Sequence, residues 1–337
     1  MIMQPVTIKT IAEKLGLSIA TVSRALKDSH EISAPTRERV KQAALELGYQ
    51  PNVNASGLRA GSSKTIAVMV PEVENHFFSQ VISGIESVAR ANDFHVLIYL
   101  THEDPVKEEE FVQLLRNGRA DGLLISVTHN PNGYAYLNRL RETGFPLVLF
   151  DRLVEEVDVP VVATNNESAS YEACNLLFQR GAARPAFLGL DPNLYITKTR
   201  LSGYLRALKE NRPEMEPLIF TGSGQPEKDR EALQGFLEQY RPDALFGAAE
   251  SMALLLYEVC RRKGYRIPED YQLISFTNLG AVTFLNPSLT SIVQPAFEIG
   301  RSAAELLFKV IKKKRIYAAE QKQILPSAIR MAESLKA

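Results

Sequence analysis

The sequence predicts a chain of two parts, an all-α helix-turn-helix head joined to a larger α/β core with two lobes. Residues 6–27 hold two short amphipathic helical patterns separated by a glycine. From Thr65 onward, short apolar runs alternate with helical patterns, which is typical of doubly wound parallel sheets covered on both faces. The alternation occurs in two series, and the second begins near Glu167. We therefore expect two similar lobes.

The head is predicted to begin with a helix that starts at Ile8. Thr7 is a suitable N-cap, because its hydroxyl can accept a hydrogen bond from a free backbone N–H group. Apolar residues recur at the spacing of one helix face up to Leu15, and Gly16 can leave the helix in a left-handed conformation. Ser18 can cap the next helix. This geometry is a helix-turn-helix, and its second helix would lie in a DNA major groove.

A third helix is predicted to close the core of the head. It begins after Ser33, with a proline in its first turn, and ends at Gly48. Its inward face consists of Val40, Ala43, Ala44 and Leu47.

The core is predicted from alternating strands and helices. Its first series has expected strands at 66–70, 95–100, 122–127 and 147–150, with helices over 81–89 and near 106–117 and 133–143. Its second series has expected strands at 186–190, 218–220, 244–246 and 273–276. In such sheets, ligands bind at the carboxyl ends of the strands. Two facing lobes would therefore enclose a cleft.

The charges are divided unevenly between head and core. The whole chain of 337 residues has a net charge of zero, with 39 Lys and Arg against 39 Asp and Glu. Residues 1–64 hold nine basic and five acidic side chains, and the remainder holds 30 and 34. A basic head on an acidic body fits a DNA-binding module attached to a part that does not touch DNA, although solvated helix faces could give the same small excess.

The remaining composition indicates a reduced, soluble protein. The two cysteines, Cys174 and Cys260, lie in apolar helical patterns and form neither a disulfide framework nor a metal site. No secretion signal is visible and no apolar run reaches about 18 residues, so we expect a cytoplasmic protein without membrane contact. The histidines are scattered and no catalytic constellation stands out. We expect no cofactor, no metal and no enzymatic activity.

The head resembles the N-terminus of the LacI/GalR family of bacterial transcription regulators. The resemblance rests on Val6–Ile8, Ala12, Gly16, Ser18, Thr21–Arg24 and Leu26. It continues through Ser33, Thr36–Arg37, Val40, Leu47–Tyr49, Pro51–Asn52, Ala55 and Leu58–Arg59. It implies a homodimer on a pseudo-palindromic double-stranded DNA operator, in a bacterial protein associated with the nucleoid.

By this resemblance, residues of the head and of the following segment contact DNA. Ile19, Ala20 and Arg24 match base-reading positions, and arginine suits a guanine edge. Leu58 matches a leucine on a hinge helix that enters the minor groove and kinks the duplex, with Arg59 beside it. Gly57 departs from the family pattern and would weaken that helix by about 1 kcal/mol relative to alanine. The other expected DNA-binding residues are Thr7, Ser18, Thr21, Ser23, Lys27, Tyr49, Asn52 and Ala55.

The resemblance also implies that the core is like a periplasmic sugar-binding protein, whose chain crosses between the lobes three times. We therefore divide the chain into a DNA-binding domain (1–50), a hinge helix and linker (51–64) and an effector-binding and dimerisation core (65–337). Within the core, the expected first lobe spans about 65–163 and 292–322. The expected second lobe spans about 164–291 and 323–337.

Nine residues of the core match effector-binding positions of the family: Phe77, Phe78, Asp151, Arg152, Asn165, Arg200, Glu250, Thr277 and Asn278. The two aromatic residues are as well explained by core packing, and Asp151–Arg152 by a surface salt link. Arg200 could bind a carboxylate, a phosphate or a vicinal diol. Asn165 and Thr277 stand where the family often has carboxylates. Their absence suggests the hypothesis of an anionic effector, such as a sugar acid or sugar phosphate, held by Arg152 and Arg200.

These features predict a ligand-responsive DNA-binding transcription regulator, most simply a repressor of carbohydrate-related genes. Its effector would be a sugar, sugar acid or sugar phosphate that changes the order of the hinge helices. Two alternatives share the two-lobed core, a solute-binding protein and an enzyme. A solute-binding protein would need an export signal and would lack the N-terminal helices.

Overall fold

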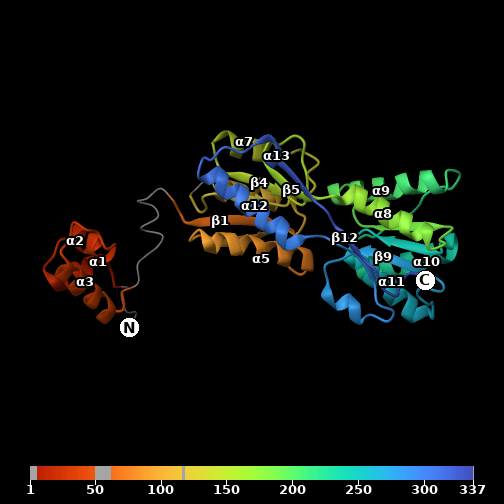
Figure 1. Ribbon diagram of the computed structural model, residues 1–337, viewed down its shortest axis with the longest axis horizontal. Coiled ribbons are helices and arrows are strands. Elements are labelled where there is room, and N and C mark those ends of the chain that lie inside the picture. Colours follow the sequence, from red (N-terminus) through yellow and green to blue (C-terminus); the bar gives the residue numbers. More distant parts are fainter. Residues whose placement is uncertain (1–5, 50–61, 116–117, 337) are drawn as a thin grey trace. The chain divides into compact units, whose positions relative to one another are not determined.

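The computed structural model describes residues 6–49, 62–115 and 118–336, and divides into two compact units, Met1–Ser63 and Lys64–Ala337 (Figure 1). We describe each unit by itself. Residues 51–61 of the predicted hinge helix and linker (51–64) lie outside the described part of the chain. The expectations for Asn52, Ala55, Leu58 and Arg59 therefore concern residues on which the structure gives no information.

The first unit contains three helices, α1 (Ile8–Leu15), α2 (Ile19–Leu26) and α3 (Ala34–Glu46). The predicted starts of the first two are confirmed, because the hydroxyls of Thr7 and Ser18 accept from the backbone N–H groups of Thr10 and Thr21. Gly16 ends α1 with φ +64, a conformation that glycine adopts without steric cost. The apolar faces meet in one small core, which consists of Ile11, Ala12, Val22, Ala25, Val40, Ala43 and Ala44.

The start of α3 differs in detail from the prediction. Ser33 occupies the N-cap position but makes no capping hydrogen bond. Its hydroxyl instead lies 2.8 Å from that of Thr36. The predicted proline is present in the first turn, where its missing N–H group is of no consequence.

The first lobe of the second unit is a six-stranded sheet in the order β11-β5-β4-β3-β1-β2. Its strands are β1 (Thr65–Val70), β2 (His95–Leu100), β3 (Leu123–Ile125), β4 (Leu147–Phe150), β5 (Val161–Thr164) and β11 (Lys322–Leu325), all paired in parallel. Helices α5 (His76–Ala91) and α12 (Ala296–Ile311) cover one face, and α6 (Pro105–Leu115) and α7 (Ala135–Glu142) cover the other. A short helix, α13 (Ala318–Gln321), precedes β11.

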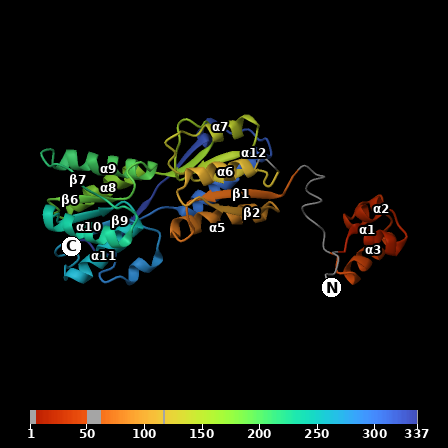
Figure 2. The same cartoon turned by 180° about the vertical axis from the view of Figure 1, so that it is seen from behind.

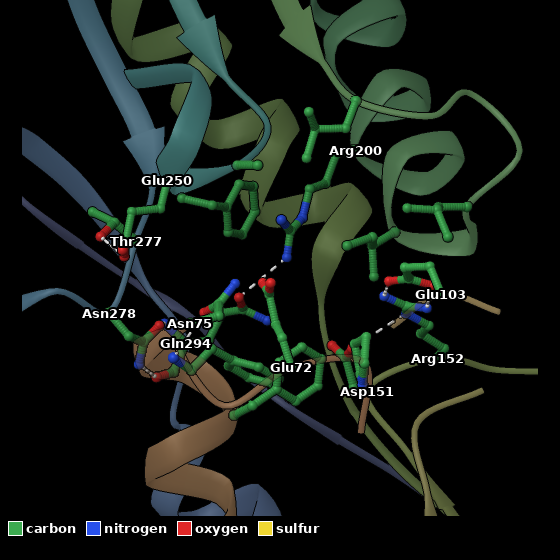
Figure 3. Close-up of a pocket in the computed structure, with 18 residues that line it drawn as sticks. Glu72, Asn75, Glu103, Asp151, Arg152, Arg200, Glu250, Thr277, Asn278 and Gln294 are labelled. Atoms are coloured by element: carbon green, nitrogen blue, oxygen red, sulfur yellow. Dashed lines mark hydrogen bonds and ion pairs between the residues drawn. The ribbon is translucent and has the colours of Figure 1, made fainter. Parts of the chain in front are cut away.

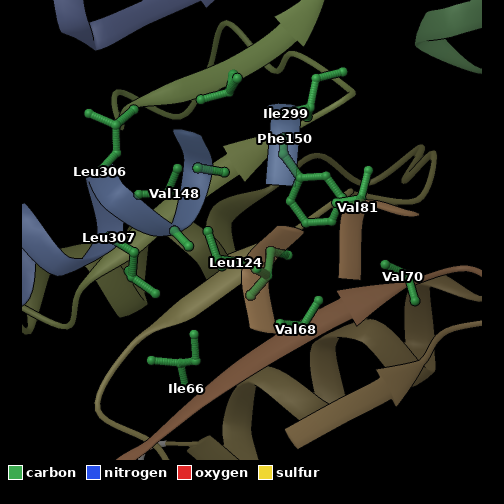
Figure 4. Close-up of a cluster of buried hydrophobic side chains, with 14 of the residues drawn as sticks. Ile66, Val68, Val70, Val81, Leu124, Val148, Phe150, Ile299, Leu306 and Leu307 are labelled. Atoms are coloured by element: carbon green, nitrogen blue, oxygen red, sulfur yellow. The ribbon is translucent and has the colours of Figure 1, made fainter. Parts of the chain in front are cut away.

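Both faces of this sheet are buried, which explains the continuous apolar runs in the sequence. Ile66, Val68 and Val70 of β1 point to α5 and α12, where Phe150 and Leu307 also lie (Figure 4). Ala67 and Met69, which alternate with them, point to the opposite face.

The second lobe has a similar architecture, except that its edge strand β12 pairs antiparallel with β10. Its sheet has the order β12-β10-β9-β8-β6-β7. The strands are β6 (Pro185–Gly189), β7 (Leu218–Thr221), β8 (Ala244–Gly247), β9 (Gln272–Phe276), β10 (Thr290–Val293) and β12 (Ala328–Arg330). Helices α8 (Asn166–Gln179) and α9 (Tyr195–Asn211) cover one face, and α10 (Pro226–Tyr240) and α11 (Glu250–Lys263) cover the other. A 3-10 helix, η1 (Gly280–Phe284), follows β9. The predicted fold class is confirmed.

The chain crosses between the two sheets after β5, after β10 and after β11. Because β10 reaches Val293 and β11 reaches Leu325, the last two crossings lie two to three residues beyond the expected boundaries at 291 and 322. The strands β5, β10, β11 and β12 were not expected. They are no shorter than β3 and β4, which were expected. Polar residues interrupt the apolar pattern of β10, β11 and β12, whereas β5 is apolar apart from Thr164 and was missed.

In each lobe, one pair of helices is packed unusually closely at glycines. A Cβ atom on Gly300 of α12 would lie 2.0 Å from the Val81 carbonyl oxygen of α5, and one on Gly203 of α9 would lie 2.2 Å from the Glu167 carbonyl oxygen of α8. These positions accept no side chain without separating the helices. Within the described residues, no helix combines the length and apolarity that crossing a bilayer demands.

Candidate functional site

A pocket lies where the carboxyl ends of the two sheets face each other, and 18 residues line it (Figure 3). Most of its polar residues lie within three residues of the end of a strand. Glu72 follows β1, Glu103 follows β2, Asp151 follows β4, Thr277 follows β9 and Gln294 follows β10. This is the ligand position that parallel α/β sheets favour.

The structure brings eight of the nine sequence-predicted effector residues together in this pocket. They are Phe77, Phe78, Asp151, Arg152, Arg200, Glu250, Thr277 and Asn278. Asn165 does not line it. Its Oδ1 accepts from the backbone N–H of Ser327 at 2.7 Å and its Nδ2 donates to Ser168 at 2.9 Å, so it joins the first and third crossings between the lobes.

Arg200 is the central cation of the pocket. It comes from the buried face of α9 and is only 4% exposed. Its guanidinium donates to Asn166 Oδ1 (2.8 Å), to the Ala248 carbonyl oxygen (2.6 Å) and to Gln294 Oε1 (3.1 Å), and it lies 3.7 Å from the centre of the Phe276 ring. Among the described residues, no carboxylate forms an ion pair with it. Burial lowers its pKa to about 10, so the side chain is charged at neutral pH.

Two amides around Arg200 have unsatisfied donors. Asn166 and Gln294 are 3% and 6% exposed, and each turns its oxygen to the guanidinium. The buried Nδ2 of Asn166 and Nε2 of Gln294 then have no hydrogen-bond partner among the described residues. A buried donor without a partner costs about 1–3 kcal/mol. Gln294 lines the pocket, so a ligand oxygen is a natural partner for its Nε2 group (Figure 3).

Asp151 is a buried acceptor on the first lobe. It follows β4 with φ +66, and the Arg152 N–H bonds back to the Phe150 carbonyl oxygen at 2.7 Å, which closes a strained three-residue turn. One carboxylate oxygen accepts from the Ser126 hydroxyl at 3.1 Å. Burial raises the pKa of Asp151, while the nearby Arg152 and Arg200 oppose this rise. The second oxygen is available to a ligand hydroxyl.

The guanidinium of Arg152 is bonded to other residues of the protein. It donates two hydrogen bonds to Glu103, at 2.8 and 2.6 Å, and a third to the Val127 carbonyl oxygen at 2.8 Å. Burial opposes its charge, yet Glu103 and Asp151 together keep the pKa of Arg152 above its ordinary value. The role in anion binding that the sequence suggested for Arg152 is therefore not supported, because its charge is already neutralised.

The predicted lack of carboxylates is compensated by other residues. The Thr277 hydroxyl donates to Glu250 at 2.5 Å, so an acid from α11 stands beside this position. Glu72 and Glu103 also line the pocket. In total, four acidic and two basic side chains face it.

Further contacts join the lobes at the rim of the pocket. Asn278 Nδ2 donates to Gln80 Oε1 at 3.1 Å and to the Gln294 carbonyl oxygen at 2.8 Å. His76 Nδ1 lies 3.6 Å from Glu250 Oε1. Separation of the lobes must break the contacts of Asn278 with Gln80 and of His76 with Glu250.

Ten lining residues were not predicted from the sequence, among them Glu103 and Gln294. Glu103 comes three residues after β2 and Gln294 directly after β10. The rule that ligands bind at the carboxyl ends of strands would have found Glu103, because β2 was predicted. Gln294 could not be found in this way, because β10 was not recognised.

In the head, none of the nine described residues expected to bind DNA is buried. They are Thr7, Ser18, Ile19, Ala20, Thr21, Ser23, Arg24, Lys27 and Tyr49. Ile19 at the start of α2 is 48% exposed, although it is apolar. Arg24 donates to Glu31 at 2.8 Å. This exposed pair costs little to separate when Arg24 meets a base edge.

A helix-turn-helix head with an exposed second helix, together with a two-lobed core that encloses a polar pocket, defines a ligand-responsive DNA-binding transcription regulator. Comparisons with known proteins agree. Residues 7–52 match the model of the bacterial regulatory proteins of the lacI family, and residues 63–328 match that of the periplasmic binding proteins and sugar-binding domain of the LacI family. The chain belongs to the LacI family, whose members are regulators that bind operators and sugar effectors as dimers and are not enzymes.

Individual relatives and structures support the same assignment. The HTH-type transcriptional repressor CytR of Escherichia coli K12 is 34% identical over 303 residues, which cover 89% of this chain and 88% of CytR. Catabolite control protein A of Staphylococcus xylosus is 30% identical over 96% of this chain and 97% of its own. A LacI-family regulator from Silicibacter pomeroyi superposes with a TM-score of 0.84 at 27% identity, over 99% of this chain and 100% of that chain. The lac repressor dimer bound to operator and an anti-inducer superposes with a TM-score of 0.85 over the same shares at 22% identity, a likeness of fold alone.

Proposed function

We propose that this protein is a homodimeric repressor of carbohydrate-related genes, and that a neutral polyhydroxylated compound in the interlobe pocket changes its affinity for a pseudo-palindromic operator. The protein would act in the bacterial cytoplasm, on the nucleoid. The observation that carries this proposal is the position of Arg200. It faces the pocket and bonds to Asn166 at the first crossing and to Gln294 at the second. A ligand that binds Arg200 therefore acts on the residues about which the lobes move.

The charges of the pocket favour a neutral ligand over an anion. Arg200 has no carboxylate partner within the described residues, but Asp151, Glu72 and Glu250 face the same space. Hydroxyl groups can donate to Asp151 and accept from Arg200 and Gln294, whereas a carboxylate or phosphate would be repelled by the three acids. The Phe77, Phe78 and Phe276 side chains supply apolar contact for a ring.

Operator recognition and the response to an effector are tested in two steps. Operator sequences are selected from a random duplex library with the full-length protein, and their affinity is then measured with and without each compound of a sugar and nucleoside panel. We expect a palindromic consensus and an affinity change with a neutral compound. Binding without sequence preference would contradict the proposal.

The exposed apolar side chains of the second lobe support a dimer contact. Phe284 in η1 is 89% exposed and Leu254 on α11 is 38% exposed. Helix α11 lies beside the segment that follows η1, because the Tyr257 hydroxyl donates to the Pro287 carbonyl oxygen at 2.8 Å. Large exposed aromatic residues are typical anchors of protein interfaces.

We predict that Phe284→Asp converts the dimer into a monomer, because it places a charge in an apolar interface. Sedimentation velocity of the wild type and the Phe284→Asp variant at micromolar concentration measures the dimer dissociation constant. We expect the variant to dimerise about 100-fold more weakly, a loss of about 2.7 kcal/mol. Val106→Asp is the control, since Val106 is also apolar and 65% exposed but lies on α6 of the other lobe. Equal dimer affinities for both variants would exclude Phe284 from the interface.

For the hinge segment, we predict that Leu58→Ala weakens operator binding and leaves binding to random DNA unchanged. An apolar wedge acts only where the duplex is kinked, whereas non-specific binding depends on phosphate contacts. Fluorescence anisotropy with the selected operator and a random duplex of equal length measures both. Equal losses on the two duplexes would contradict a wedge role.

A further inference from the structure

A group of basic side chains lies at the C-terminal end of α12, outside the pocket and the head. Lys312, Lys313, Lys314 and Arg315 follow the last residue of the helix, and all four are exposed. No carboxylate within the described residues forms an ion pair with any of them. We call these four residues, together with Lys64, the α12 basic cluster.

Lys64 belongs to the cluster through a pair of aromatic rings. The Phe94 and Phe308 rings are 4.9 Å apart at an angle of 82°. Lys64 Nζ lies 4.7 Å from the centre of the Phe94 ring, and Lys312 Nζ lies 5.7 Å from that of Phe308. The start of β1 and the end of α12 therefore meet at one end of the first lobe, as the two views of the molecule also show (Figures 1 and 2).

This end of the lobe is predominantly basic. The segments that meet there are Lys64, 92–95, 118–122 and 312–315. They contain six Lys and Arg side chains against two Asp side chains. The core as a whole is acidic, so the excess of positive charge here is local rather than a property of the surface in general.

Lys313 occupies a conformation that normally favours glycine. Its φ is +50, and the helix ends with the Lys314 N–H bonded to the Lys309 carbonyl oxygen and the Lys313 N–H bonded to that of Val310. This is the Schellman arrangement, in which glycine is the usual residue. A lysine at the end of a helix gains from the helix dipole, about 0.3–1 kcal/mol when exposed. The left-handed conformation costs about 1–2 kcal/mol, so stability alone does not favour lysine here.

We propose that the α12 basic cluster binds phosphates of the DNA that the head has bound. The proposal rests on the DNA-binding function above and adds a second contact surface, on the core. Lys64 is the residue at which the chain from the head enters the core. Only 15 peptide bonds separate it from Tyr49, the last described residue of the head, and they span at most about 50 Å. The length of the linker therefore allows the cluster to reach DNA that the head has bound.

Such contacts carry a measurable signature. Each phosphate neutralised by a protein cation releases counterions and contributes about −0.9 to the slope of log affinity against log salt concentration. Phosphate contacts do not read bases, so they raise the affinity for operator and for random DNA alike. We expect about two to three contacts for each core, because the cluster is compact.

The test compares three full-length proteins on 40-base-pair duplexes between 50 and 200 mM KCl. The cluster variant combines Lys312→Gln, Lys313→Gly, Lys314→Gln and Arg315→Gln. The matched control combines Lys198→Gln, Lys209→Gln, Lys228→Gln and Arg261→Gln, which remove the same charge from exposed positions of the second lobe. Anisotropy is measured on a selected operator and on a random duplex.

We expect the cluster variant to bind both duplexes about tenfold more weakly at 100 mM KCl, with a slope that is smaller by about 2 to 3 for each core, while the control keeps the wild-type slope. Equal slopes for all three proteins would overturn the proposal. A loss of binding to vesicles with anionic headgroups, without any change on DNA, would also overturn it and assign the cluster to membranes. Failure of the wild type to prefer its operator would instead contradict the proposed function.

The single variant Lys313→Gly separates folding from binding. Glycine relieves the left-handed backbone, so the melting temperature should not fall. The salt slope should still decrease by about 0.9 for each core. A lower melting temperature together with an unchanged slope would mean that Lys313 serves the helix end and not DNA.

Discussion

Replacement of Arg200 by methionine is expected to abolish the response to the effector without unfolding the protein. Methionine fills a similar volume against Phe276 but provides none of the donors that face the pocket. Loss of charge-assisted hydrogen bonds to the ligand should cost about 2.7 kcal/mol, or about 100-fold in affinity. The lowered pKa of Arg200 shows that burial disfavours its charge in the folded state. At neutral pH, the neutral side chain removes that cost, which partly compensates for the acceptors of Asn166, Ala248 and Gln294 that lose their donor.

The measurement is a thermal-shift screen with neutral sugars, nucleosides, sugar acids and sugar phosphates. A ligand at 100 times its dissociation constant should stabilise the wild type by about 2.7 kcal/mol, and the Arg200→Met variant by little. Arg206→Met is the control on the same helix, because Arg206 is exposed and pairs with Glu167 at 3.0 Å. If the ligand raised the melting temperature of the Arg200→Met variant as much as that of the wild type, Arg200 would not contact the ligand. A response confined to acids or phosphates would refute the neutral-ligand argument.

Much of the fold could be predicted because local signals were strong. Thr7, Gly16 and Ser18 mark the helix-turn-helix by capping chemistry alone. The buried strands read as apolar runs because both faces of each sheet are covered. The strands β10, β11 and β12 contain polar residues and gave no such signal, and their positions depend on pairing with strands far away in the sequence.

The site was predicted in part, because residue type does not reveal hydrogen-bond partners. Arg152 and Arg200 look equivalent in the sequence, yet Glu103 neutralises the first and no carboxylate within the described residues pairs with the second. Glu103 is 49 positions from Arg152, so this difference is visible only in the folded chain. The role of Thr277 also depended on a distant partner, since Glu250 supplies the carboxylate that its position lacks.

Gly203 links the packing of the second lobe to the site. It lies one turn after Arg200 on α9, where the helix passes closest to α8. A Cβ atom there would lie 2.2 Å from the Glu167 carbonyl oxygen and 2.8 Å from the Tyr171 nitrogen, which are backbone atoms and cannot rotate away. Any side chain must therefore separate the two helices. Asn166, which accepts from Arg200, lies on α8 and would move with respect to it.

We predict that Gly203→Ala lowers the free energy of unfolding by about 3 kcal/mol, at the upper end of overpacking effects, and weakens ligand binding at least about tenfold. Gly235→Ala is the matched control. Gly235 also lies within a helix, α10, but a Cβ atom added to it would have no heavy atom of the described residues within 4 Å, so alanine should stabilise the protein by up to about 1 kcal/mol. Urea unfolding followed by circular dichroism, and ligand titration of both variants, measure the difference. If the two alanine variants have the same free energy of unfolding, helices α8 and α9 do not pack as closely at Gly203 as the distance of 2.2 Å implies. If Gly203→Ala is destabilised but binds ligand normally, Arg200 is positioned independently of this helix pair, and the coupling between packing and recognition is absent.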